Sequence, residues 1–247
     1  MGENFVLMLL LVASLVQILV AAPTYNPRQL SLPSQLNPYP TKPRLSFRPD
    51  GTFKITVFSD LHFGENAWDV WGPQQDVNST RLMRKVLADE KPDYVFINGD
   101  LITGENTFRE NSTVYIDEIV APLNDVKVPF SSTHGNHDNQ ANITHLEEIL
   151  REQRDAPLSY TRVAPPGVGG EYGPGNYWVP VNFQPALIIW AFDSRGGWSE
   201  GQGSAPLPDW VDDSVATWIE QETALMDSVW GPPDKTRGAL AFVHIPP

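Results

Sequence analysis

The chain has 247 residues, of which 41% are hydrophobic and 19% are charged. This composition excludes a wholly disordered chain, and the length allows one α/β core with a tail. The formal net charge of -13 disfavours a nucleic-acid backbone or an anionic membrane surface as a partner, because like charges repel. The chain contains no cysteine. Disulfides and thiolate metal sites are therefore excluded, and any metal must be held by Asp, His, Asn or Glu.

An apolar run at residues 5–20 has the length of a signal-peptide core and is followed by Ala21 and Ala22. We therefore expect residues 1–22 to be a signal peptide, with an uncleaved membrane anchor as the alternative. N-glycosylation sequons at Asn78, Asn111 and Asn142 fit a secreted glycoprotein. The sequence thus predicts entry into the secretory pathway, with no stable membrane association unless the leader stays uncleaved.

Prolines recur throughout residues 23–49, which disfavours both a helix and a central strand there. We expect this stretch to be an extended linker and residues 50–247 to form the folded domain. Within that domain, the apolar pattern predicts strands and helices in alternation. The expected strands are 53–59, 94–97, 128–133, 186–192 and 239–243, and the expected helices are 81–87 with a cap at 78–80, 112–123 ended by Pro122, 143–153 and 209–229.

Strand–helix repeats of this size are typical of right-handed βαβ units, so the fold class is predicted to be α/β with a largely parallel sheet. Residues 156–208 are rich in Gly and Pro. Apart from the strand at 186–192, they are expected to form long loops.

Four polar clusters stand directly after predicted strands. They are Asp60-Leu61-His62, Gly99-Asp100, Gly135-Asn136-His137-Asp138 and His244. In an open α/β sheet, residues at the carboxyl ends of the strands converge on one edge, where ligands bind. The spacing of Asp60 and His62 puts both side chains on one face of an extended strand, because side-chain direction repeats every second residue.

These residue types suit a centre of two metal ions. Asp60 and His62 would hold one cation, Asn136 and His244 a second, and the two oxygens of Asp100 would bridge metals about 3.5–4 Å apart. Water activated between two such cations becomes hydroxide near neutral pH and attacks phosphorus in line. The predicted reaction is therefore metal-dependent hydrolysis of a phosphate ester.

His137 is predicted to be catalytic, because it can point over the cavity and protonate the leaving alkoxide, while Asp138 orients its imidazole. The alternative for Asp60 and Asp100 is a helix cap or a turn, a common use of Asp after a strand. His134 is expected to pack beside the site, and His145 to lie on the surface of a helix. Arg195, with the Gly196–Trp198 stretch, fits either a phosphate clamp or a tight turn.

In this order and with these intervals, the D-x-H, G-D and G-N-H-D motifs resemble those of the calcineurin-like metallophosphoesterase superfamily. Within it, the amino-acid sequence of residues 58–64, 98–104 and 243–246 is similar to that of fungal and plant proteins described as purple-acid-phosphatase-like. The resemblance implies two packed mixed β-sheets flanked by helices. It also implies two metal ions, drawn from iron, zinc, manganese or magnesium, and a phosphoester substrate that is a small molecule or a phosphoprotein.

The sequence departs from this family pattern at two points. Thr103 stands where purple acid phosphatases have a tyrosine, so a purple ferric site is not expected. The superfamily also closes its site with a G-H-x-H motif beyond the position of His244, and the sequence reaches Pro247 without it. We therefore expect a C-terminally truncated domain that lacks one ligand at each metal. The alternative function is a catalytically silent secreted glycoprotein, or a gene-model fragment, that retains the scaffold; a nuclease is less favoured.

Overall fold

Residues 36–182 and 185–246 are described by the computed structural model. They belong to a compact unit that begins at Ser34. The expected signal peptide or anchor and the first part of the expected linker lie outside the described residues. Among the helices that are described, none combines the length and the apolar composition that a membrane span requires.

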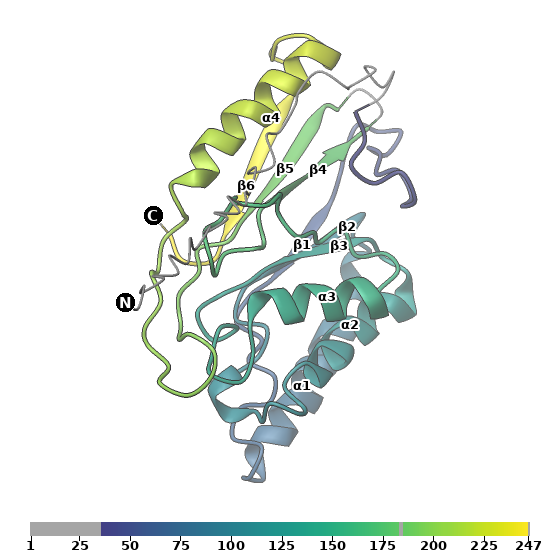
Figure 1. The fold of residues 1–247 in the computed structure, drawn as a ribbon. Coiled ribbons are helices and arrows are strands. Elements are labelled where there is room, and N and C mark those ends of the chain that lie inside the picture. Colours follow the sequence, from purple (N-terminus) through teal and green to yellow (C-terminus); the bar gives the residue numbers. More distant parts are fainter. Residues whose placement is uncertain (1–35, 183–184, 247) are drawn as a thin grey trace, which may run out of the picture. The chain divides into compact units, whose positions relative to one another are not determined.

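Helices and strands follow one another along the chain and build two three-stranded sheets (Figure 1). The elements are β1 (Ile55–Phe58), α1 (Trp71–Glu90), β2 (Tyr94–Asn98), the 3-10 helix η2 (Gly104–Asn106), α2 (Val114–Val126), β3 (Phe130–Thr133), α3 (His145–Asp155), β4 (Tyr177–Val181), β5 (Leu187–Phe192), α4 (Ser214–Trp230) and β6 (Gly238–Val243). The predicted α/β class with two sheets and flanking helices is confirmed.

The two sheets differ in strand direction. The first has the order β1-β2-β3 and is wholly parallel, because α1 and α2 provide the crossover connections that parallel neighbours need. This half has the largely parallel character that the strand–helix alternation predicts. The second sheet is mixed: β4 runs antiparallel to β5, and β6 runs parallel to β5.

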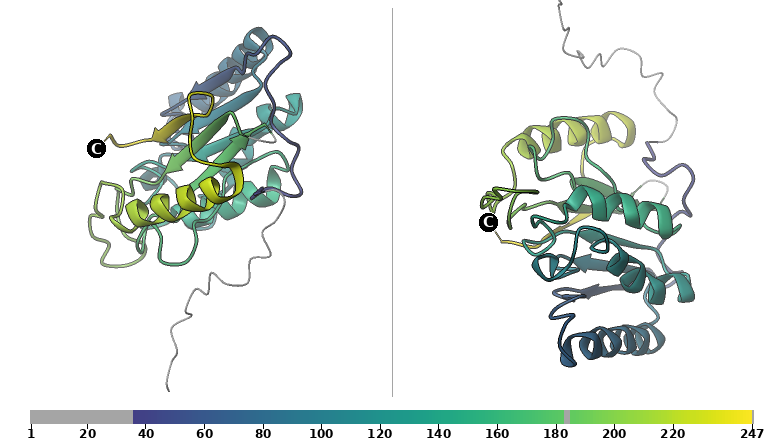
Figure 2. Two further views of the ribbon diagram at one scale, coloured as in Figure 1. Left: turned by 90° about the horizontal axis from the view of Figure 1, so that it is seen from above. Right: turned by 60° about the horizontal axis from the view of Figure 1, so that its bottom comes forward.

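Alternating residues of β2 divide the core into two layers. Val95 and Ile97 belong to the cluster that includes buried residues of α1 and α2, whereas Tyr94 and Phe96 face the second sheet and pack with Val179, Ile189 and other apolar residues. This follows from the two-residue period of a strand. The outer face of the second sheet is covered by α4, through Trp178, Ile188, Trp190, Val215, Trp218 and Met226. Helices thus flank the paired sheets on both sides (Figures 1 and 2).

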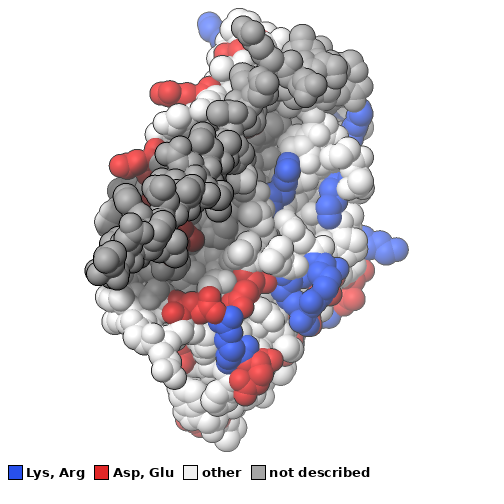
Figure 3. Space-filling model, in the orientation of Figure 1, with Lys and Arg blue, Asp and Glu red and all other residues white. Residues whose placement is uncertain are grey.

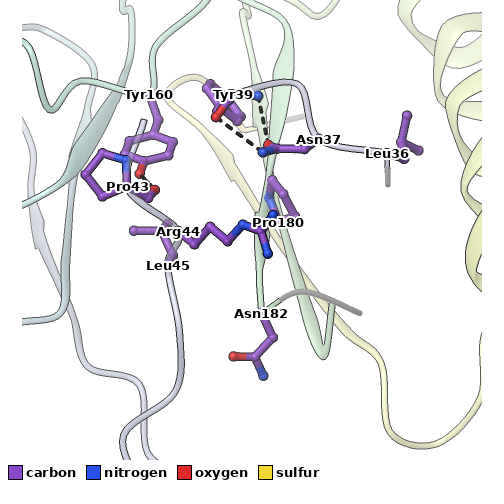
Figure 4. Close-up of a pocket in the computed structure, with 9 residues that line it drawn as sticks. All are labelled: Leu36, Asn37, Tyr39, Pro43, Arg44, Leu45, Tyr160, Pro180 and Asn182. Carbon is purple, nitrogen blue, oxygen red and sulfur yellow. Dashed lines mark hydrogen bonds between the residues drawn. The ribbon is translucent and has the colours of Figure 1, made fainter. Parts of the chain in front are cut away.

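Residues 36–49, the described part of the expected linker, pack against the second sheet. Tyr39 and Leu45 are 6% and 5% exposed. The Tyr39 hydroxyl donates to the Trp178 carbonyl at 3.0 Å, and the Asn182 N–H donates to the Leu45 carbonyl at 2.9 Å. Figure 4 shows this segment beside Tyr160, with its turn closed by hydrogen bonds between the Asn37 side chain and the backbone of Tyr39. The compact unit therefore begins before the predicted boundary at residue 49.

The other departures from the predicted elements have local causes. β4 falls within the region expected to be loops, and it contains Pro180. Proline is tolerated there because, within the described part of the chain, β4 is an edge strand that pairs with β5 alone. α1 begins at Trp71, so the predicted cap at 78–80 lies inside it; Pro73 is accepted in its first turn, where N–H groups have no partner in the helix. Pro122 lies inside α2 and does not end it.

The packing of residues 36–49 predicts a stability cost for Leu45→Ala. Removing a fully buried Leu side chain should lower the free energy of unfolding by about 2–5 kcal/mol, through lost burial and the cavity left behind. The matched control is Leu82→Ala on α1, where the side chain is 62% exposed and the expected change is within about 0.5 kcal/mol. Urea unfolding followed by circular dichroism measures both. Equal stabilities for the two variants would contradict the packing of this segment.

Candidate metal centre

Three of the predicted ligands meet beyond the ends of β1 and β2. One ligand atom each from Asp60, His62 and Asp100 lies within 4.8 Å of the others. His244, which follows β6 of the second sheet, joins them: its Nε2 is 3.2 Å from Oδ2 of Asp100. The Nε2 of His62 is 3.6 Å from the same oxygen. Side chains from both sheets therefore converge on the Asp100 carboxylate.

The backbone that presents these side chains is unusual. Asp60, His62 and Asp100 have φ angles of 55°, 50° and 49°, in the left-handed region that residues other than glycine rarely adopt. The Asp60 N–H donates to the Gly99 carbonyl at 3.1 Å, and the His62 N–H donates to the Asp100 carbonyl at 3.0 Å. Because β1 ends at Phe58, strand alternation is not what aligns Asp60 with His62. The strained turns held by these bonds do so, and such strain clusters at functional sites.

The second ring nitrogen of each histidine is held by a neighbour. Nδ1 of His244 lies 2.8 Å from the Asn98 carbonyl, and Nδ1 of His62 lies 3.1 Å from Oγ1 of Thr103. A carbonyl can only accept, so Nδ1 of His244 donates a proton to it, and Nε2 is the nitrogen that could face a metal. Thr103, which replaces the tyrosine of the family pattern, thus supports His62.

The loop that carries Asn136 and His137 presses against Asp100. The His137 N–H donates to Oδ1 of Asp100 at 3.0 Å, and the His137 ring lies 5.0 Å from the His62 ring. Gly135 makes the approach possible, because a Cβ there would stand 2.3 Å from Oδ1 of Asp100. Asn136, between these two residues, therefore lies on the same rim as the other candidates.

Asp138 does not have the predicted contact with His137. Its buried carboxylate accepts from the backbone N–H groups of Ile102 at 3.0 Å and Gly135 at 2.7 Å, so it braces the loop. The neighbour of His137 is Glu105, whose Oε1 lies 2.6 Å from Nδ1. The prediction that Asp138 orients the His137 ring is wrong, because side chains of adjacent residues diverge. Glu105 lies in the same G-D-L-I-T-G-E-N segment as Asp100, which could have drawn attention to it.

Asp100 and its neighbours shift one another's pKa values at the centre. Burial opposes the ionised form of Asp100, but hydrogen bonds from His244 and the His137 backbone outweigh it and lower the pKa of the Asp100 carboxyl. Burial likewise opposes the charged form of His244, yet Asp100 and the Asn98 carbonyl raise the pKa of this imidazole to about 9. Burial and the charge of Asp100 raise the pKa of Asp138 to about 7. Carboxylate, imidazole and amide donors of this kind suit zinc, iron, manganese or magnesium.

The contacts of Arg195 favour a tight turn over a phosphate clamp. Its guanidinium is 2.9 Å from Oδ2 of Asp212, donates to the Trp210 carbonyl and lies over the Trp210 ring. With these partners, Arg195 organises a loop. Gly196 and Gly197 both have positive φ, as a tight turn requires.

Comparison with known proteins finds a matching family and several relatives. The family model described as calcineurin-like phosphoesterase matches residues 53–213. A protein named probable inactive purple acid phosphatase 14, from Arabidopsis thaliana, is 28% identical over 227 residues, which covers 82% of this chain and 55% of that protein. Phosphatase DCR2 of Saccharomyces cerevisiae is 28% identical over 218 residues, which covers 82% of this chain and 36% of that protein. A solved structure of a dimetal phosphatase from Danio rerio has a TM-score of 0.49 and 15% identity, over 78% of this chain and 69% of that one.

The chain spans about half the length of the plant relatives it matches, 55% for purple acid phosphatases 14 and 28 and 59% for purple acid phosphatase 29. All three of these Arabidopsis proteins carry the words "probable inactive" in their names.

The close contact at Gly135 predicts that Gly135→Ala weakens metal binding. The added Cβ would stand 2.3 Å from Oδ1 of Asp100 and 2.6 Å from Cδ2 of His244, so both side chains must move. We expect Mn²⁺ affinity, measured by isothermal titration calorimetry, to fall about 10- to 100-fold. In the control Gly238→Ala, the nearest atom to the new Cβ is 3.8 Å away, and affinity should be unchanged. The same dissociation constant for both variants would contradict the geometry described.

Proposed function

The chain belongs to the calcineurin-like phosphoesterase family, and we propose that it hydrolyses phosphate esters at a centre of two metal ions. The observation that carries the proposal is the position of the Asp100 carboxylate, with Nε2 of His62 and Nε2 of His244 both directed at its Oδ2. A carboxylate in such a place can serve two cations, because it has two oxygens and each can bind a metal.

Each metal would have its own set of ligands beside Asp100. Asp60 and His62 would hold the first, and Asn136 and His244 the second, with the Nδ1 contacts of both histidines fixing their rings. Iron, zinc, manganese and magnesium all suit these donors. Two bound metal ions would activate the attacking water and offset the charge on the phosphoryl oxygens.

His137 would donate a proton to the leaving alkoxide. Its Nδ1 faces Glu105 at 2.6 Å, which leaves Nε2 as the atom that can reach the ester oxygen. The contact with Glu105 favours the charged, proton-donating form of the imidazole and, against the opposing effect of burial, raises the pKa of His137. Glu105 thus takes the orienting role.

The substrate would be a phosphoester of a small molecule or a phosphoprotein. The net charge of -13 opposes binding of a nucleic-acid backbone. On the face displayed in Figure 3, the largest group of Lys and Arg side chains lies next to Asp and Glu side chains. Arginine side chains are likewise paired with carboxylates in ion pairs such as Arg84–Asp125 and Arg109–Glu147. The described residues visible on this face do not form a basic stripe of the kind that tracks phosphates.

A second candidate function is a secreted protein that keeps the scaffold without catalysis. The names of the plant relatives favour it. Metal content separates the two candidates, since a catalytic centre should purify with close to two metal ions per chain. A silent scaffold should hold much less, by inductively coupled plasma mass spectrometry.

Entry into the secretory pathway is also proposed, and the sequons differ in their suitability for a glycan. Asn78 is exposed on the outer surface of α1. Asn111 is half-buried, and its side chain accepts from the Phe108 N–H at 2.9 Å. Asn142 is half-buried, and its Nδ2, the atom that carries an N-linked glycan, donates to the Thr107 carbonyl. Asn78 is therefore the proposed principal glycosylation site.

The proposed activity predicts metal-dependent turnover that is lost in Asp100→Asn. With Mn²⁺ or Zn²⁺ and p-nitrophenyl phosphate, the variant should lose at least about 100-fold in kcat/KM, because one change weakens both metal sites. The control is Asp89→Asn on α1, a charge in a surface ion pair. Both variants are assayed beside the unsubstituted chain, with and without added metal. Turnover that is indifferent to metal and to Asp100 would refute the proposal.

The sequon geometry predicts that Asn78→Gln removes one glycan mass from protein secreted by a eukaryotic host. Asn142→Gln should leave the mass unchanged, because the amide nitrogen of Asn142 is engaged with Thr107. Intact-mass spectrometry before and after glycosidase treatment measures both. A glycan found on Asn142 and absent from Asn78 would contradict this assignment.

A further inference from the structure

His145 and Asp193 form a buried pair beneath the candidate metal centre. The sequence predicts His145 on a helix surface, but its side chain is 0% exposed, as is that of Asp193. Nδ1 of His145 lies 3.0 Å from each carboxylate oxygen of Asp193. Nε2 lies 2.9 Å from the carbonyl oxygen of Gly135. Both ring nitrogens are therefore occupied.

The partners of the ring settle its protonation. The Gly135 carbonyl can only accept a hydrogen bond. The Asp193 carboxylate also acts as an acceptor, for the N–H groups of Gly175 at 2.9 Å and Arg195 at 2.8 Å. A ring that donates to both must carry two protons, so the pair is an imidazolium with a carboxylate. Burial alone would lower the pKa of His145, but the charge of Asp193 outweighs it and raises that pKa.

The pair joins the second sheet to the loop of the first. Asp193 directly follows β5, and Gly135 directly precedes Asn136. Gly135 is also where the loop touches the centre, since a Cβ there would stand 2.3 Å from Oδ1 of Asp100. The bond from His145 therefore holds the loop backbone at Gly135, two residues before the His137 N–H that donates to the Asp100 carboxylate.

Two observations argue against a role in folding alone. The start of α3 is already satisfied by a capping box between Thr144 and Glu147, so the His145 ring is not needed as a cap. His134 is equally buried, 5.1 Å from the His145 ring. Neither of its ring nitrogens has a hydrogen-bond partner among the residues that the structure describes. Burial of a histidine here therefore does not by itself produce bonds to the loop.

We propose that His145 and Asp193 are a positioning pair that fixes the loop from Gly135 to Asp138 against Asp100, at the separation which Asn136 and Asp100 need to share a metal ion. The shared metal ion rests on the proposed function. The position of the loop depends on the His145 bond whether or not a metal is bound.

The test compares His145→Gln, Asp193→Asn and the double variant with Tyr177→Phe. The control removes a buried but uncharged hydrogen bond outside the loop, from the Tyr177 hydroxyl to the Ser132 carbonyl at 2.6 Å. Amide hydrogen exchange, read by mass spectrometry in the presence of a chelator, reports on peptides covering residues 134–142 and 94–98. Calorimetry with Mn²⁺ gives the metal affinity of the same proteins.

We expect exchange at residues 134–142 to be faster by about 10-fold or more in both single variants, because a buried bond involving a charged group is lost. Mn²⁺ affinity should fall about 10- to 100-fold. The double variant should resemble the weaker-binding single variant, since the two residues act as a unit. Tyr177→Phe should change neither readout, and β2 should stay protected throughout.

Unchanged exchange at residues 134–142 in His145→Gln would overturn the proposal. Loss of protection at 94–98 together with the loop would also overturn it, because the pair would then serve the fold as a whole. If the unsubstituted chain binds no Mn²⁺, the proposed function fails, while the exchange measurement still decides whether the pair positions the loop.

Discussion

Asp100 lies just beyond β2 in a left-handed backbone conformation. Its carboxylate is contacted by groups that follow β1, β3 and β6. His62 and His244 direct Nε2 at it, and the His137 N–H donates to it. A buried carboxylate is costly unless positive charge or hydrogen bonds compensate it. The surrounding imidazoles and N–H group supply that compensation, which is why the pKa of the Asp100 carboxyl is lowered despite its burial. The candidate ligands His62 and His244 therefore lie around the Asp100 carboxylate.

The centre depends on how the two sheets are held together, because His244 comes from the second sheet. The stacked rings of Phe96 and Phe242, 3.9 Å apart, bring β6 against β2. The Asn98 side chain donates to the Val243 carbonyl, and the Asn98 carbonyl meets Nδ1 of His244. The apolar layer between the sheets thus sets the separation of the ligands. Changes in this layer would be felt at the metal site, since close-packed interiors transmit strain.

Long periodic segments predicted the fold well, and short or proline-containing ones did not. The apolar run of β2 and the apolar pattern of α3 carry their own signal. β4 contains Pro180, which argues against a strand unless the strand lies at an edge, and edge position is a property of the assembled sheet. Residues 36–49 lack regular structure, and their burial depends on the surface that β4 presents. Neither could be inferred from local pattern.

For the site, the sequence by itself determined which side chains stand at the carboxyl ends of strands: Asp60, His62, Asp100, Asn136, His137 and His244 follow directly from where apolar runs stop. Only the tertiary structure decided which groups support them. Asp193 lies 48 residues from His145 along the chain, and neither stands in a recognisable motif. Strand and helix periods specify the direction of a side chain within its own element. Contacts between elements depend on packing, so the pairing of His145 with Asp193 became visible only once the tertiary structure brought them together.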